Sequence, residues 1–154
     1  MNALSIYRKL EKYPFGKWIF SKLTCFKAPY FGTVKPLFTE LKPGRCVIFM
    51  KKRRAVTNHI KTVHAIAMCN IVELAGGMCI DISLPKEKRW IPRNMTVEYI
   101  TFAKTDLIGV CEIDLQQLSS WDMKKLFPVV VNLNDTSGKT VMRGTVEMYL
   151  SMKK

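Results

Sequence analysis

The sequence predicts an α+β protein in which an antiparallel sheet of five to six strands curls around one long central helix, with short helices at the N-terminus. The apolar segment 63–79 supports the central helix, because a helix with no polar face has to be enclosed. Six short segments rich in β-branched residues can supply the enclosing sheet. The only strongly polar side chains in the apolar segment are His64, Asn70 and Glu73.

The first part of the chain mixes large apolar side chains with lysines at helical spacing, and Pro14 and Gly16 interrupt the pattern. We expect two short amphipathic helices within an N-terminal helical segment, residues 1–31, followed by the sheet-and-helix domain, residues 32–154, in one domain overall. Packing of these helices on their own domain is favoured. A membrane interface is the less favoured alternative, since Trp, Phe and Lys are interleaved.

Strands are expected both before and after the central helix in the sequence. Residues 33–41 and 45–53 form a predicted hairpin. The second segment is apolar and β-branched enough to be a buried strand. A loop rich in charge and proline is expected at 84–94, and a short turn or helix at 116–127. Gly138 marks a second hairpin connection where a positive φ is expected. The remaining strands are predicted at 95–104, 106–115, 127–135 and 140–151.

The composition describes a globular protein of 154 residues, long enough for one domain with its own core. Its five cysteines are odd in number and form no C-x-x-C pair, and no cleavable apolar leader follows Met1. We therefore expect core thiols and a cytoplasmic location. No run is expected to reach the 18 apolar residues of a membrane span.

A net charge of +13 attracts nucleic acid, anionic lipid, phosphorylated ligands or acidic proteins alike. A solvated surface is the ordinary interpretation of such charges. Nucleic-acid binding is not favoured, because the chain has no RNP, KH or helix-turn-helix pattern and its lysines are spread.

A motif leads into the central helix, with the form N-x5-H-[GA] and an acidic residue nine positions after the histidine. Its members are Asn58, His64, Ala65 and Glu73. With this motif and the segments 93–107 and 138–150, residues 32–152 resemble the hotdog-fold thioesterase superfamily, especially its acyl-CoA thioesterase branch. The subgroup that the sequence resembles is described as a domain of unknown function.

The resemblance implies hydrolysis of acyl-CoA or acyl-carrier-protein thioesters by a homodimer, with a dimer of dimers left open. Glu73 falls on the catalytic carboxylate, a general base or a nucleophile. Ala65 falls where a backbone N–H polarises the thioester carbonyl, and Asn58 where an amide side chain helps to position it. No metal or cofactor is implied, because coenzyme A is part of the substrate.

Two departures from the family pattern leave the hydroxyl that orients water unassigned. Some members carry a Thr four residues after the acid, where this chain has Gly77, and others carry a Ser on the next strand, near Pro92. Thr96 or Thr101 could take this role. A non-catalytic acyl-binding dimer therefore stays open as the alternative function, with a nucleic-acid or membrane-surface binder as a weak third.

The predicted substrate-binding residues lie on the helix and on its basic flanks. Four helical residues follow one stripe and leave room for a ligand: Asn70, Glu73, Gly76 and Gly77. His64 at the helix start is expected to bond the backbone, and it borders the same site. Arg54, Lys61 and Arg89 are candidates for binding the phosphates of coenzyme A.

The helix also predicts the assembly. Ala65 and Glu73 are eight residues apart, about 12 Å along a helix axis, so one carbonyl carbon cannot meet both. Two antiparallel helices about a two-fold axis would bring the N-terminus of one to the middle of the other. Each dimer would then hold two composite sites.

Overall fold

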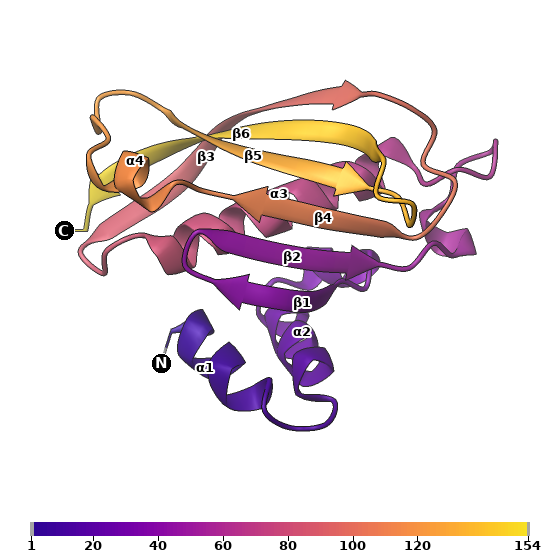
Figure 1. Ribbon diagram of the computed structural model, residues 1–154, viewed down its shortest axis with the longest axis horizontal. Coiled ribbons are helices and arrows are strands. Elements are labelled where there is room, and N and C mark those ends of the chain that lie inside the picture. Colours follow the sequence, from indigo (N-terminus) through magenta and orange to yellow (C-terminus); the bar gives the residue numbers. More distant parts are fainter. Residues whose placement is uncertain (1, 154) are drawn as a thin grey trace.

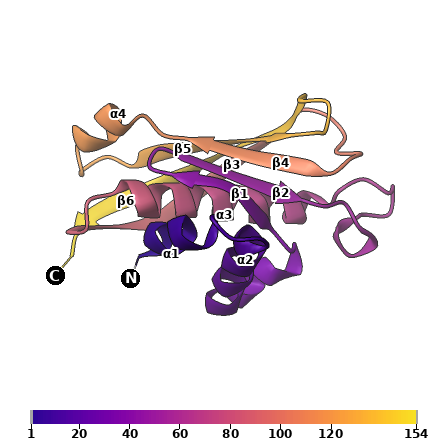
Figure 2. The same cartoon turned by 60° about the horizontal axis from the view of Figure 1, so that its bottom comes forward.

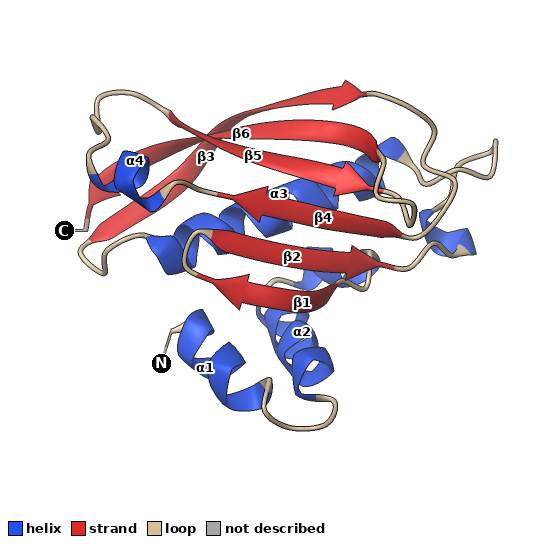
Figure 3. Cartoon of the chain, in the orientation of Figure 1, coloured by secondary structure: helices blue, strands red, loops and turns tan. Residues whose placement is uncertain are grey.

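The computed structural model describes residues 2–153 and shows one six-stranded antiparallel sheet wrapped over a long helix (Figures 1 and 3). The predicted α+β class and hotdog architecture are confirmed. In chain order the helices and strands are α1 (Ala3–Leu10), α2 (Gly16–Lys27), the 3-10 helix η1 (Pro29–Thr33), β1 (Leu37–Lys42), β2 (Arg45–Met50), the 3-10 helix η2 (Arg54–Val56), α3 (Ala65–Ser83), β3 (Lys88–Tyr99), β4 (Leu107–Glu112), α4 (Leu115–Ser119), β5 (Phe127–Asn134) and β6 (Thr140–Met152).

The strands lie in the order β1-β2-β4-β5-β6-β3, so β1 and β3 are the two edges of the sheet. Every neighbouring pair is antiparallel. The two expected hairpins, β1–β2 and β5–β6, are present, and Gly138 in the second turn has a φ of 86°, which favours glycine. The helix α3 links β2 to β3 and crosses the concave face between them (Figure 1).

The helix α3 packs its apolar side onto the sheet, where Ile71, Val72 and Ala75 are fully buried. By length and composition alone α3 is apolar enough to cross a membrane, so the expectation that no run reaches that length was wrong. More than half of its apolar stretch is buried inside the fold, which identifies it as a core helix. Three of the five cysteines are buried with it, whereas Cys25 and Cys69 are half-buried.

The strand β3 begins at Lys88, so the loop predicted over 84–94 is much shorter and most of that segment is strand. The strand also ends at Tyr99, earlier than predicted. The long strand β6 provides the pairing partner, and backbone hydrogen bonding to it outweighs the local charge and proline signals. Pro92 is tolerated because it lies at a register shift on an edge strand.

Both predicted N-terminal helices are present, and they pack beside β1 and below α3 (Figure 2). Aromatic rings connect the layers edge to face: Tyr7 of α1 lies 5.1 Å from Phe20 of α2, and Phe20 lies 5.2 Å from Phe38 of β1. The buried Ser21 hydroxyl accepts a hydrogen bond of 2.9 Å from the backbone N–H of Phe38. These contacts cover the β1 edge of the sheet.

The close approach of α3 to the sheet generates a stability prediction. A Cβ on Gly144 of β6 would lie 2.5 Å from the Val72 side chain, so Gly144→Ala should lower the free energy of unfolding by about 1–3 kcal/mol through overpacking. Gly32→Ala is the matched control, because its Cβ would meet only the Cys25 side chain at 3.7 Å. Urea unfolding of both variants measures the difference, and equal midpoints would contradict the packing described here.

Candidate functional site

The side of α3 that faces away from the sheet forms the floor of a groove of about 560 Å³. One wall comes from α1, α2 and η1, and the other from the start of β3. Apolar side chains dominate the lining, among them Ile6, Phe20, Leu23, Phe31, Met78 and Trp90. Two carboxylates, Glu73 and Asp81, are part of the lining.

Glu73 projects from the exposed side of α3 into this groove. The enclosure that the apolar sequence 63–79 predicts does not extend to Glu73, whose side chain is exposed in the single chain. The reason is that the sheet covers only one side of α3. Val72 and Gly76 face the sheet and are buried, whereas Glu73 is exposed and has no covering layer within residues 2–153. Its carboxylate makes no ion pair with a residue in that range.

The two departures from the family pattern meet at this groove. Gly77, one turn after Glu73, and Pro92 of β3 both line it, and neither supplies a hydroxyl. A Cβ on Gly77 would lie 2.9 Å from the Trp90 ring, so Gly77 is needed for Trp90 to pack across α3. The indole of Trp90 donates a 3.1 Å hydrogen bond to Asp81, which holds this wall in place.

Two other sequence expectations do not fit the groove. Gly76 faces the sheet, where a Cβ would lie 3.3 Å from Val129, so Gly76 serves packing and does not line the groove with Glu73. Thr96 pairs with Thr145 of β6, which alternates with buried Gly144 and Val146 and therefore points to the outer face. Thr96 consequently lies on the side of the sheet away from α3.

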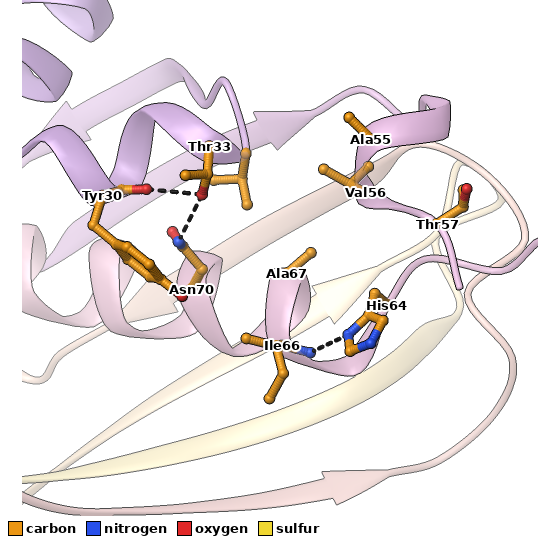
Figure 4. Close-up of a pocket in the computed structure, with 10 residues that line it drawn as sticks. Tyr30, Thr33, Ala55, Val56, Thr57, His64, Ile66, Ala67 and Asn70 are labelled. Carbon is orange, nitrogen blue, oxygen red and sulfur yellow. Dashed lines mark hydrogen bonds between the residues drawn. The ribbon is translucent and has the colours of Figure 1, made fainter. Parts of the chain in front are cut away.

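The N-terminus of α3 borders a second, smaller pocket of about 200 Å³ (Figure 4). His64 is the N-cap, and its Nδ1 accepts a 3.1 Å hydrogen bond from the N–H of Ile66, as expected for a histidine at a helix start. The N–H groups of Ala65 and Ala67 have no acceptor among residues 2–153. Free amides at the positive end of a helix can stabilise an anion.

Asn70 lies in this second pocket rather than in the groove with Glu73. It is 5% exposed, its Nδ2 lies 3.5 Å from the Thr33 hydroxyl, and its Oδ1 has no hydrogen-bond donor among residues 2–153. The Thr33 hydroxyl in turn donates to the carbonyl of Tyr30 at 2.8 Å (Figure 4). Asn70 thus brings an unused acceptor to the pocket at the helix N-terminus.

Asn58 uses its side chain to close the loop that precedes α3. Its Nδ2 donates to the Thr62 hydroxyl at 2.8 Å, and its Oδ1 accepts from the N–H groups of Thr62 and Ile60 at 3.0 and 3.2 Å. Such side-chain bonds to nearby backbone N–H groups are typical of an Asn that closes a turn. The loop geometry in turn places His64 and the start of α3.

The predicted basic residues lie at opposite ends of α3 within one chain. Arg54 and Lys61 belong to the segment before its N-terminus. Arg89 lies beyond its C-terminus, in a pocket of about 420 Å³ that shares Asp81 and Trp90 with the groove. Other basic residues of this pocket are Lys86, Lys88 and Lys153.

Tyr99 is a polar residue of the site region that the sequence analysis did not identify. Its hydroxyl lies 3.8 Å from the sulfur of Cys69, which is one helical turn before Glu73. Desolvation, followed by the hydrogen bond with Cys69, raises the pKa of Tyr99 above its ordinary value, so the hydroxyl keeps its proton at neutral pH. No cluster of three or more His, Cys, Asp or Glu side chains within residues 2–153 is arranged to hold a metal ion.

Comparison with known proteins identifies relatives. A family model described as "Domain of unknown function (DUF4442)" matches residues 16–150. A crystal structure from genomics work, with no activity in its description, is 37% identical over 98% of this chain and 99% of that chain, with a TM-score of 0.84. No curated protein matches the sequence.

Two more distant structures share the fold. A protein of unknown function from Pseudomonas aeruginosa, described as a probable thioesterase, is 21% identical over 85% of this chain and 92% of its own, with a TM-score of 0.78. A thioesterase family protein from Silicibacter pomeroyi is 15% identical over 86% of this chain and 96% of its own, with a TM-score of 0.70.

The hydrogen bonds of Asn58 generate a prediction about the loop before α3. Asn58→Ala should lower the free energy of unfolding by about 1–2 kcal/mol, because three side-chain hydrogen bonds are lost. Asn58→Asp keeps the two acceptor bonds and should fall between Asn58→Ala and the unmodified protein. The exposed neighbour His59 offers the control His59→Ala, and chemical denaturation compares the set. If Asn58→Ala proved as stable as His59→Ala, the loop-closing role would be wrong.

Proposed function

Since this chain belongs to the DUF4442 family, a domain of unknown function, and has the hotdog fold of thioesterases, we propose that it hydrolyses acyl thioesters carried by coenzyme A or an acyl carrier protein. The observation that carries the proposal is the position of Glu73. Its carboxylate lines an apolar groove of about 560 Å³, a size typical of small-molecule sites. The acyl chain occupies the groove, and Glu73 meets the thioester at its floor.

In this mechanism the carboxylate of Glu73 takes a proton from water, and the resulting hydroxide attacks the thioester carbonyl carbon. The carbonyl oxygen becomes an oxyanion, which the free N–H of Ala65 stabilises together with the positive end of the helix. Collapse of the tetrahedral intermediate breaks the carbon–sulfur bond, and the thiol leaves with the proton from Glu73. Direct attack by the carboxylate, through an anhydride that water then hydrolyses, is the alternative order of steps.

The two halves of this site come from different chains, because Glu73 and Ala65 are about 12 Å apart along α3. Two features of the single chain support a dimer at this place. The exposed side of α3 lacks a cover within residues 2–153, and the β3 edge is unpaired there over its whole length. The inner-face side chains Met95 and Tyr99 of β3 are also exposed, although they point toward the helix side of the sheet.

An antiparallel pairing of the two α3 helices also accounts for the separated basic residues. If Ala65 of one chain faces Glu73 of the partner subunit, the two-fold axis passes beside Cys69. The C-terminal end of each helix then lies next to the segment that precedes the other helix. Arg54 and Lys61 thereby approach Arg89 of the partner subunit, and together they can bind the phosphates of coenzyme A or the acidic surface of a carrier protein.

A non-catalytic acyl-binding dimer is the second candidate function. The observation that favours it is the absence of a hydroxyl at Gly77 and Pro92, the two groove positions where related enzymes orient water. Two hydroxyls of the region are alternatives. The Tyr99 hydroxyl lies 3.8 Å from the sulfur of Cys69, one helical turn before Glu73, and Thr24 lines the groove. Binding of acyl-CoA without release of free thiol, across a broad range of chain lengths, would favour this second candidate.

The role of Glu73 leads to the first functional prediction. Glu73→Gln should preserve the fold and reduce thioester hydrolysis by roughly 10² to 10⁴-fold, because a positioned general base contributes that much. Glu98→Gln is the matched control, since Glu98 is an exposed carboxylate whose partner Arg143 lies on the outer face of the sheet. Thiol release from acyl-CoA substrates measures both variants. Full activity in Glu73→Gln would refute the catalytic role.

The composite site leads to a second prediction, tested by mixing variants. Ala65 is the first residue of α3, where proline is tolerated, so Ala65→Pro should remove the oxyanion donor and leave the helix intact. Homodimers of Ala65→Pro and of Glu73→Gln should each be nearly inactive. In mixed dimers one site carries both changes and the other carries none, so random pairing leaves about a quarter of all sites whole.

Activity of the mixture should therefore rise far above that of either parent. Ala65→Ser, which keeps the N–H, is the control and should retain activity. If a mixture shown by native mass spectrometry to contain heterodimers stays inactive, Glu73 and the helix N-terminus do not act across two chains.

A further inference from the structure

The N-terminal helices carry an apolar surface that no other part of residues 2–153 covers. The four most exposed large apolar or aromatic side chains in this range all lie within a stretch of eighteen residues, 13–30. They are Tyr13, Phe15, Phe26 and Tyr30, with Phe26 87% exposed and Phe15 80% exposed. Exposed apolar side chains gathered on one part of a surface mark an interaction site.

Phe26 belongs to a wider set of exposed apolar side chains on one side of α2. Ile19, Leu23 and Phe26 follow one another at spacings of four and three residues, and Trp18 directly precedes Ile19. The four side chains therefore share the outward face of α2, which we call the α2 apolar face. The opposite side of the helix, with Phe20 and Ser21, is buried against the rest of the protein. Figures 1 and 2 agree that α2 lies at the periphery of the molecule, outside β1.

The N-terminal segment that contains this face, residues 2–31, is strongly basic. It contains six exposed basic side chains and one acidic residue, Glu11; the basic residues are Arg8, Lys9, Lys12, Lys17, Lys22 and Lys27. The Lys22 ammonium lies 5.4 Å from the centre of the Trp18 ring, so charge and aromatic surface are interleaved on the α2 apolar face itself. Long basic side chains can extend their charge past a buried apolar face to reach anionic groups.

We propose that the α2 apolar face and the loop before it dock on an anionic lipid bilayer. Interleaved aromatic and lysine side chains on an amphipathic helix are typical of helices that lie in a membrane interface. The anchors are also widely spaced: Phe15 and Phe26 are eleven residues apart, about 16 Å along the helix, which suits a broad flat surface. A second copy of this chain is disfavoured as the occupant, because it would bring two strongly basic surfaces together.

Docking at this face also brings the groove to the lipid surface. Leu23 belongs both to the α2 apolar face and to the groove lining. Its neighbours on the groove side, Thr24 and Lys27, lie on the same helix. A ligand that partitions into the bilayer through an acyl chain would therefore enter the groove beside the docked helix. The docking itself is independent of any reaction in the groove.

Vesicle co-sedimentation tests the docking. The unmodified protein should bind phosphatidylcholine vesicles that contain about 30% phosphatidylglycerol, and it should bind pure phosphatidylcholine vesicles much more weakly. The double variant Trp18→Ser/Phe26→Ser should lower the affinity for the anionic vesicles at least roughly tenfold. Its matched control is Leu126→Ser/Val130→Ser, which removes two apolar side chains exposed elsewhere on the molecule and should bind like the unmodified protein.

Charge is tested in the same way. Lys12→Glu/Lys22→Glu should weaken vesicle binding far more than Lys124→Glu/Lys125→Glu, an equal change of charge on the loop between α4 and β5. Circular dichroism confirms that each variant is folded. Equal losses in the two lysine pairs would show general electrostatic attraction and overturn the proposal. Unchanged vesicle binding by Trp18→Ser/Phe26→Ser would also overturn it, and a changed molecular mass of that variant would identify a second copy as the occupant.

Discussion

The packing of α3 into the concave face of the sheet is the constraint on which the rest of this structure depends. A helix with so few polar side chains loses most from exposure to water, and six antiparallel strands give it an apolar surface to cover. The contact is close because glycines face the helix: a Cβ on Gly109 would lie 2.7 Å from Ile71, and one on Gly144 would lie 2.5 Å from Val72. Small residues in the sheet thus allow branched residues in the helix to reach it.

A sheet can cover only one side of a helix, and the uncovered side of α3 becomes the floor of the groove. The two walls differ in origin, since Trp90 and Pro92 come from an edge strand, whereas Phe20, Leu23 and Phe31 come from helices at the start of the chain. The N-terminal helices therefore have two surfaces with separate properties. Their inner side covers the β1 edge and borders the groove, and their outer side is aromatic and basic.

The candidate chemistry depends on a distance along the same helix. The free N–H groups at the start of α3 and the carboxylate of Glu73 lie too far apart to act on one carbon atom, and each is accessible in the single chain. The exposed inner-face side chains Met95 and Tyr99 of β3 point to the helix side of the sheet, where Tyr99 contacts Cys69 of α3. Assembly, catalysis and the clustering of basic residues consequently become parts of one arrangement in the proposed dimer.

Local pattern was sufficient to predict the fold class, the central helix, both hairpins and the positive φ of Gly138, because each depends on residues close together in the chain. The motif from Asn58 to Glu73 likewise indicated the candidate site, whose catalytic role stays a prediction. Pairing with β6 converted most of the expected loop at 84–94 into strand. The sheet covers only one side of α3, so Glu73 on the other side is exposed, whereas Gly76 faces the sheet. Tertiary structure alone decided three further features. They are the hydrogen bonds of Asn58, the contact of Tyr99 with Cys69, and the contribution of the N-terminal helices to one wall of the groove. These features depend on which segments meet in space, and hydrophobic periodicity contains no information about the partner that a given face will find.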